Sequence, residues 1–220
     1  PIFRMLGSDP IYQYDDGLGQ ERQGVISLEP VYEKAGMDRR WVDYFLESIV
    51  NQPCLAFNYA QAGQENSFTW SNMSKGLEMQ IPILDSLRKE NKIRVETLGE
   101  SGAWFKECFK VTPATAVTTL TDVRGEGNKT VWFNSRYYRV NLLWEKGTFR
   151  FRDIHLFDES YKSAYLEKPG DGNQFLFYTL PVVDGFMWSE GLDRAGLRIV
   201  QLDKKGGKEE LTLDHPVVTE

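Results

Sequence analysis

Acidic side chains recur where apolar runs of the chain give way to a turn or a polar loop. They are Asp9, Glu29, Glu96 and Glu100. Glycoside hydrolysis needs two carboxyl groups across the scissile bond, one acting as acid and the other as base or nucleophile. We therefore predict that these four residues form the catalytic set of a glycan-degrading enzyme, with Glu29 and Glu96 as the first pair.

Aromatic and amide side chains fall in or beside the same loops. Aromatic rings offer stacking surfaces to sugars, and amide or carboxylate groups form hydrogen bonds with hydroxyls. The predicted substrate-binding residues are Tyr12, Tyr14, Asn58, Gln61, Glu65, Trp70 and Trp104.

Two alternative functions come from the same stretches. The first is a non-catalytic protein that binds glycans through the aromatic loops. The second is a serine hydrolase, because Gly99-Glu100-Ser101-Gly102 resembles a nucleophile elbow, although Ala103 replaces the last glycine of that motif. Its histidine would be His155 or His215. A helix N-cap is the structural alternative for Ser101.

The elements that would position these residues alternate along residues 1–112. Short apolar runs predict strands at 2–6, 25–31, 54–59 and 93–97, and amphipathic stretches predict helices after Asp38, from Ser71 and from Ser101. Strands that alternate with helices indicate a parallel sheet. We expect the C-terminal half of a (β/α)7–8 barrel, with the acidic residues on one rim.

Helix signals are clearest in two places. Asp38 is a good N-cap for a helix with one apolar stripe of Val42, Phe45, Leu46 and Ile49. The next helix is expected to carry the stripe Met73, Leu77, Ile81 and Leu84, and to kink or divide at Pro82.

Residues 113–220 change character to alternating apolar and polar residues separated by glycine turns near Gly125 and Gly147. This pattern predicts consecutive β-hairpins. The predicted fold class is therefore α/β followed by all-β, with a partial barrel domain at 1–112 and an antiparallel β-sandwich-like domain at 113–220. We expect the chain to be a fragment of a longer protein.

The composition of the chain argues against several classes of binding partner and cofactor. The net charge of −6 argues against a general nucleic-acid binder. No apolar run reaches the roughly 20 residues of a membrane span. With only two histidines and no cysteine at metal-ligand spacing, no metal site and no cofactor are predicted. Cys54 and Cys108 are expected to be buried free thiols, and a disulfide between them is possible only if the fold brings them together.

Several stretches together resemble an uncharacterised bacterial family typical of the Bacteroidetes. They are FRMLGSDPIYQYD, VISLEPVY, TWSNMSKGLEMQIP, VETLGESGAWF and WFNSRYYRVNLLWEKGTFRFRDIHLFDE. The family is similar to glycoside-hydrolase and polysaccharide-deacetylase-like (β/α) barrels with a C-terminal β-sandwich domain. The resemblance implies an oligo- or polysaccharide partner and a periplasmic or extracellular location. It also implies that any divalent metal would take its ligands from an N-terminal part outside this chain.

Overall fold

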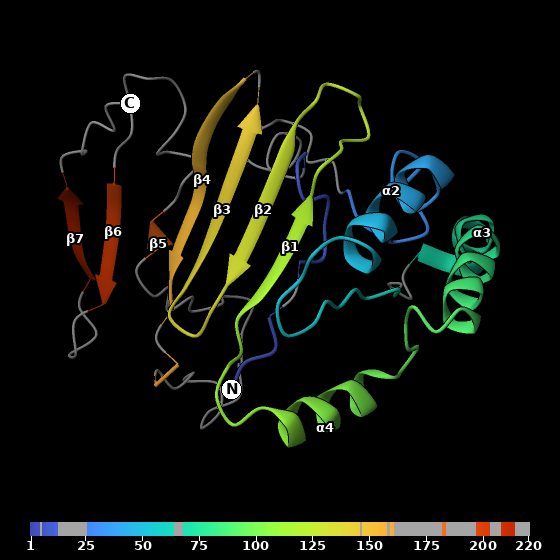
Figure 1. Ribbon diagram of the computed structural model, residues 1–220, viewed down its shortest axis with the longest axis horizontal. Coiled ribbons are helices and arrows are strands. Elements are labelled where there is room, and N and C mark those ends of the chain that lie inside the picture. Colours follow the sequence, from blue (N-terminus) through green and yellow to red (C-terminus); the bar gives the residue numbers. More distant parts are fainter. Residues whose placement is uncertain are drawn as a thin grey trace.

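The computed structural model describes residues 1–4, 6–12, 26–63, 68–145, 147–157, 159–160, 182–183, 197–202 and 208–213. The described helices are α2 (Arg39–Val50), α3 (Thr69–Lys89) and α4 (Leu98–Cys108). The described strands are β1 (Thr115–Thr119), β2 (Lys129–Asn134), β3 (Tyr138–Glu145), β4 (Thr148–Leu156), β5 (Val182–Val183), β6 (Leu197–Leu202) and β7 (Lys208–Leu213). Figure 1 shows the sheet beside α2 and α3, with α4 below.

Strands β1 to β5 form one antiparallel sheet in sequence order. Strands β6 and β7 pair with each other as a separate antiparallel ribbon. The turn glycines Gly125, Gly127 and Gly147 adopt positive φ angles, which glycine reaches without steric cost. The hairpins expected between residue 113 and Phe151 are therefore present.

The inner face of the sheet packs on α2. Val117 of β1 and Trp132 of β2 join Trp41, Val42 and Phe45 of the helix in one buried cluster. Alternation along each strand directs these residues to the same face. Helix α2 thus packs on this face at β1 and β2, which places part of the core between the helical and the β regions.

The predicted fold class is wrong. No barrel is formed by the described residues, and the described parts of the four expected parallel strands are not strands. Ser8 and Ser27 make one isolated antiparallel bridge, while the extended segments around 54–59 and 93–97 have no ladder. Phe57 in the first of these segments packs on Trp104 and Phe105 of α4, so apolar runs alone did not identify strands. The expected strand at 174–180 lies outside the described residues.

The prediction for α2 is confirmed, and the prediction for α3 is only partly right. Asp38 caps α2, accepting a hydrogen bond from Arg40 N, and the predicted apolar stripe of α2 is buried. Helix α3, by contrast, continues through Pro82 without dividing. Its buried residues are Met73, Gly76 and Gln80, whereas Ile81 of the predicted stripe is exposed.

The close approach of the α3 backbone to Pro30 determines which face of α3 is buried. A Cβ added to Gly76 would lie 2.2 Å from Pro30 O, so only glycine fits there. The neighbouring Gln80 side chain donates from Nε2 to the backbone oxygens of Leu28 (2.8 Å) and Gly36 (2.6 Å). A small residue and a buried amide thus join this helix to the loop that precedes α2, while Met79, Ile83 and Leu84 of α3 pack against the core.

Buried polar contacts hold the N-terminal segment on the sheet. Trp132 Nε1 donates to Pro10 O at 2.7 Å. Arg152 donates to Pro10 O (2.7 Å), to Ile11 O and to Asn141 Oδ1 (2.6 Å), and its side chain is 2% exposed. A β-bulge between β3 and β4 falls next to this arginine.

Asp9 belongs to the same segment and is 1% exposed. Its carboxylate accepts hydrogen bonds from Ile11 N (2.8 Å), Tyr12 N (2.6 Å) and Trp41 Nε1 (2.8 Å). Burial raises the pKa of Asp9, and these hydrogen bonds partly oppose the rise. Asp9 is therefore a buried anchor between the N-terminal segment and α2.

Asp9→Asn is expected to cost the most stability near pH 4 and less as the pH rises. The unfolded chain loses the Asp9 proton near the ordinary pKa of 3.8, but the folded protein keeps it to a higher pH. Because the folded state binds more protons in that window, the stability contributed by Asp9 falls with rising pH. Urea unfolding of both proteins from pH 4 to pH 8 measures this, with the exposed Asp43→Asn as control. A wild-type-minus-variant difference that grows with pH would contradict the assignment.

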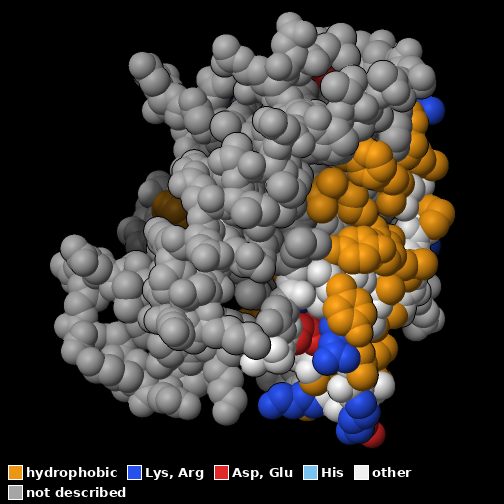
Figure 2. Space-filling view, turned by 90° about the vertical axis from the view of Figure 1, so that its left-hand side faces the viewer, with side chains coloured by type: hydrophobic (Ala, Val, Ile, Leu, Met, Phe, Trp, Pro, Cys, Tyr) orange, Lys and Arg blue, Asp and Glu red, His pale blue; other side chains and the backbone are white. Residues whose placement is uncertain are grey.

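The outer face of the sheet carries exposed aromatic side chains. Tyr138, Trp144 and Phe151, together with Tyr137 in the turn before β3, are exposed. Figure 2 shows hydrophobic side chains gathered in a band along one side of the molecule.

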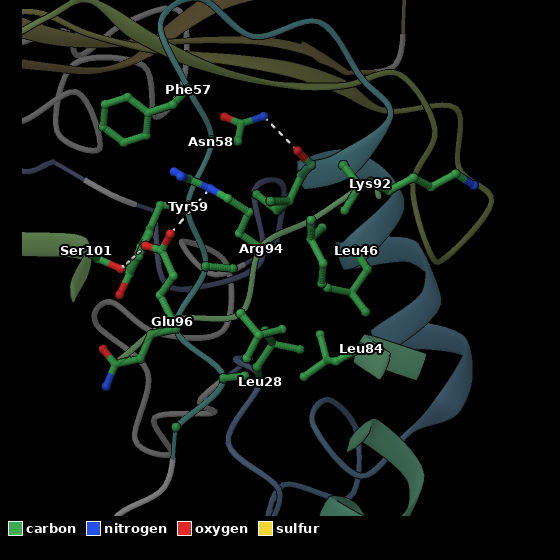
Figure 3. A pocket seen from close by; sticks show the side chains of 18 of the residues that line it. Leu28, Leu46, Phe57, Asn58, Tyr59, Leu84, Lys92, Arg94, Glu96 and Ser101 are labelled. Carbon is green, nitrogen blue, oxygen red and sulfur yellow. Dashed lines mark hydrogen bonds and ion pairs between the residues drawn. The ribbon is translucent and has the colours of Figure 1, made fainter. Parts of the chain in front are cut away.

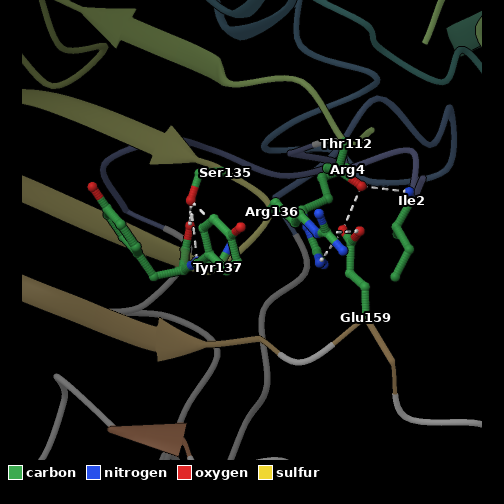
Figure 4. Close-up of polar contacts among 8 residues, drawn as sticks. Ile2, Arg4, Thr112, Ser135, Arg136, Tyr137 and Glu159 are labelled. Carbon is green, nitrogen blue, oxygen red and sulfur yellow. Dashed lines mark hydrogen bonds and ion pairs between the residues drawn. The ribbon is translucent and has the colours of Figure 1, made fainter. Parts of the chain in front are cut away.

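A polar cluster ties the chain start to the segment after β4 (Figure 4). Glu159 forms ion pairs with Arg4 at 3.3 Å and Arg136 at 3.6 Å, and it also accepts a hydrogen bond from Thr112. Ile2 N donates to Thr112 Oγ1 at 2.7 Å. These contacts join the N-terminal residues to Thr112 and to the segment that follows β4.

Candidate functional site

A cavity of about 630 Å³ lies between the helices and the two extended segments. Leu46 of α2 and Leu84 of α3 form an apolar wall (Figure 3). Residues 57–63 and 91–96 contribute further lining, and α4 adds Ser101 and Trp104. This size and mixture of apolar and polar lining are typical of small-molecule sites.

Glu96 is the single carboxylate among the described residues that line the cavity. Its Oε1 is 3.3 Å from Arg94 Nε, and its Oε2 accepts a hydrogen bond from Ser101 Oγ at 2.9 Å. Figure 3 shows these three side chains converging. Both carboxylate oxygens therefore have partners, and Glu96 contacts Arg94 and Ser101 at the wall of the cavity.

Trp104 is fixed by the surrounding aromatic rings. Its ring meets Phe57 edge-on at 5.3 Å and Phe109 edge-on at 5.7 Å. The Arg94 guanidinium lies over the Trp104 ring at 5.3 Å from the centroid. An indole held in this way, beside a cation, is a ready stacking surface.

Two amides supply hydrogen-bonding groups to the cavity. Asn58 donates from Nδ2 to Ile49 O at 2.8 Å, which fixes the side chain and leaves its oxygen without a partner among the described residues. Gln61 also lines the cavity. The structure thus brings together four of the predicted residues: Glu96, Asn58, Gln61 and Trp104.

Other predicted residues lie away from the cavity. Asp9 is the buried anchor described above. Tyr12 is 2% exposed, and its hydroxyl donates to Asp122 at 2.6 Å. Glu29 is half-buried in the turn that precedes α2 and is not part of the cavity lining. The predicted common rim of acidic residues depended on parallel strands that the described residues do not form.

Glu100 and Trp70 are exposed and outside the lining. Glu100 completes a capping box with Thr97, whose backbone N–H donates to Glu100 Oε2 at 2.7 Å. This hydrogen bond lowers the pKa of Glu100. Tyr14 and Glu65 lie outside the described residues.

Helix α4 starts earlier than predicted. Thr97 is its N-cap and Leu98 its first residue, so the N-cap role considered for Ser101 is wrong. The Thr97-x-x-Glu100 spacing is the sequence signature of a capping box, and it competes with a catalytic role for Glu100. Ser101 instead is buried in the first turn and donates to Glu96.

Sequence reasoning missed Arg94, Phe57 and Tyr59 as lining residues. A signal for Arg94 was present. In an extended segment, alternate residues point to the same side, so Arg94 and Glu96 share a face. No comparable signal marks Phe57, whose place depends on packing against α4.

Cys54 and Cys108 are free, as expected, but both are exposed, so the expectation that they are buried is wrong. The described residues contain no group of three or more His, Cys, Asp and Glu side chains that could hold a metal ion. Nor does any helix in the described ranges combine the length and hydrophobicity needed to cross a bilayer.

Comparison of the chain with protein-family models, curated proteins and solved structures finds no match. The family resemblance and the location inferred from it therefore stay predictions.

Proposed function

We propose that the protein binds an oligosaccharide in the cavity between α2, α3 and α4. One observation carries the proposal, namely that Trp104 is held at the wall beside amide and charged side chains. Protein sites for sugars combine aromatic stacking with hydrogen bonds to hydroxyls, and this lining offers both. The acceptor oxygen of Asn58 and the amide of Gln61 are suitable hydroxyl partners.

Glycoside hydrolysis is the second candidate, favoured by the carboxylate of Glu96 in the cavity. A retaining enzyme needs a second carboxyl group about 5 Å away, and an inverting enzyme needs one roughly 6.5–9.5 Å away. The described lining provides only Glu96, with both oxygens engaged. This arrangement supports binding better than turnover, and it gives Ser101 no histidine in the described lining as a base.

Trp104→Leu is expected to weaken oligosaccharide binding about 10-fold or more, because stacking on an aromatic ring is lost while an apolar side chain is kept. Isothermal calorimetry with a panel of neutral and acidic tetrasaccharides measures this. Trp70→Leu is the matched control, since Trp70 is 65% exposed and lies outside the cavity. Far-UV circular dichroism confirms that both variants are folded.

No binding of any panel member by the wild type, or an equal loss in both variants, would refute the proposal. Assaying the same panel for new reducing ends tests hydrolysis. Activity that disappears in Glu96→Gln would favour the second candidate.

A further inference from the structure

The charged side chains that line the cavity indicate which charge the bound saccharide carries. The chain has a net charge of −6, yet among the described residues that line the cavity the charged ones are two cations, Lys92 and Arg94, and one anion, Glu96. This described lining therefore has the sign opposite to that of the whole chain. A local excess of one sign raises the concentration of oppositely charged ligands in a cleft.

Arg94 is the cation on which the inference depends. Lys92 is already paired with Glu90 at 2.9 Å, and Glu90 is not part of the lining. Arg94 meets Glu96 through Nε at 3.3 Å. The structure gives its two Nη groups no hydrogen bond to any described residue. A guanidinium has five N–H donors in a planar fork, so one contact leaves most of them for a ligand.

The neighbours of Arg94 also orient it. Glu96 is itself fixed by Ser101, and the guanidinium lies over the Trp104 ring at 5.3 Å. A sugar that contacts Trp104 therefore lies close to the Nη groups. The group on a sugar that such a fork pairs with best is a carboxylate, as in a uronic acid.

Building on the proposed function, we infer that the cavity is selective for acidic saccharides of the uronic-acid type, with Arg94 as the residue that recognises the carboxylate. Glu96 is then a positioning residue. It neutralises part of the arginine charge but directs the remaining donors toward the ligand.

The test compares sugars that differ only at C6. Calorimetry at low ionic strength uses tetrasaccharides of galacturonic acid and mannuronic acid against those of galactose and mannose. At least one acidic ligand is expected to bind about 10-fold tighter than its neutral counterpart. Because Arg94 is well exposed to solvent, this preference should decrease as salt is added.

Arg94→Gln is expected to abolish the preference, because it should weaken binding of the acidic sugar much more than binding of the neutral one. Arg88→Gln on α3, an exposed arginine paired with Asp85 outside the cavity, should retain it. Equal affinities for acidic and neutral sugars, or a preference that survives in Arg94→Gln, would overturn the inference but leave the proposed function standing. Binding of neither class would refute both.

Discussion

Replacing Arg152 with Met is expected to lower the free energy of unfolding by about 3–5 kcal/mol. Met matches the unbranched stem of arginine but carries no donor. The buried oxygens of Ile11 and Asn141 would lose the guanidinium that donates to them. An unsatisfied buried acceptor costs about 1–3 kcal/mol, so two such losses account for the size of the effect.

Arg88→Met is the control, because its ion pair with Asp85 is exposed on α3. An exposed pair contributes roughly 0–1 kcal/mol. Thermal unfolding should place the Arg152 variant roughly 10 °C below wild type, given the usual scaling for chains of this length. Similar midpoints for the two variants would mean that Arg152 does not hold the N-terminal segment on the sheet.

Gly76→Ala is expected to destabilise the protein by about 1–3 kcal/mol, even though alanine is the better helix former. The new Cβ would lie 2.2 Å from Pro30 O and 2.7 Å from Pro30 Cβ. Neither atom is the end of a flexible side chain, so the helix or the loop must move. Urea unfolding at neutral pH measures the change.

Gly102→Ala in α4 is the matched control, since its added Cβ would meet no atom within 4 Å. Helix propensity alone predicts that this variant gains up to about 1 kcal/mol. The two substitutions are thus expected to have opposite signs. A gain in both would show that α3 does not approach Pro30 as closely as described.

Local signals in the sequence identified the elements that depend on near neighbours. Asp38 and the apolar stripe of α2 predict that helix because capping and periodicity are local properties. The glycine turns near Gly125 and Gly147 likewise predict the hairpins. The Thr97-x-x-Glu100 capping box was equally local, and overlooking it shifted the predicted start of α4.

Contacts between distant residues could not be predicted in this way. The apolar runs at 54–59 and 93–97 fit a strand or an extended segment that packs on helices, and pairing partners decide between them. The antiparallel Ser8–Ser27 bridge is one such long-range contact. Because the described segments do not pair as a parallel sheet, their ends do not meet at one edge, and nothing brings Asp9 and Glu29 close to Glu96.

The candidate site likewise combines features that the sequence predicts with features that depend on contacts between distant residues. Asn58, Gln61, Glu96 and Trp104 were selected for their chemistry and meet in one cavity, whereas Tyr12 was selected for the same reason and is buried elsewhere. Residue type suggested which groups suit a sugar, but only the packing of α4 against the segment around Phe57 decides which of them face a common space.

The most direct test of the central claim is to locate a bound saccharide by the indole N–H resonances of the tryptophans in ¹H–¹⁵N NMR spectra. Trp104→Leu and Trp70→Leu assign the two relevant signals. As galacturonic acid tetrasaccharide is added, the account predicts that the Trp104 signal shifts in a saturable manner while that of Trp70 stays in place. Saturable shifts confined to other tryptophans, with Trp104 unchanged, would contradict it.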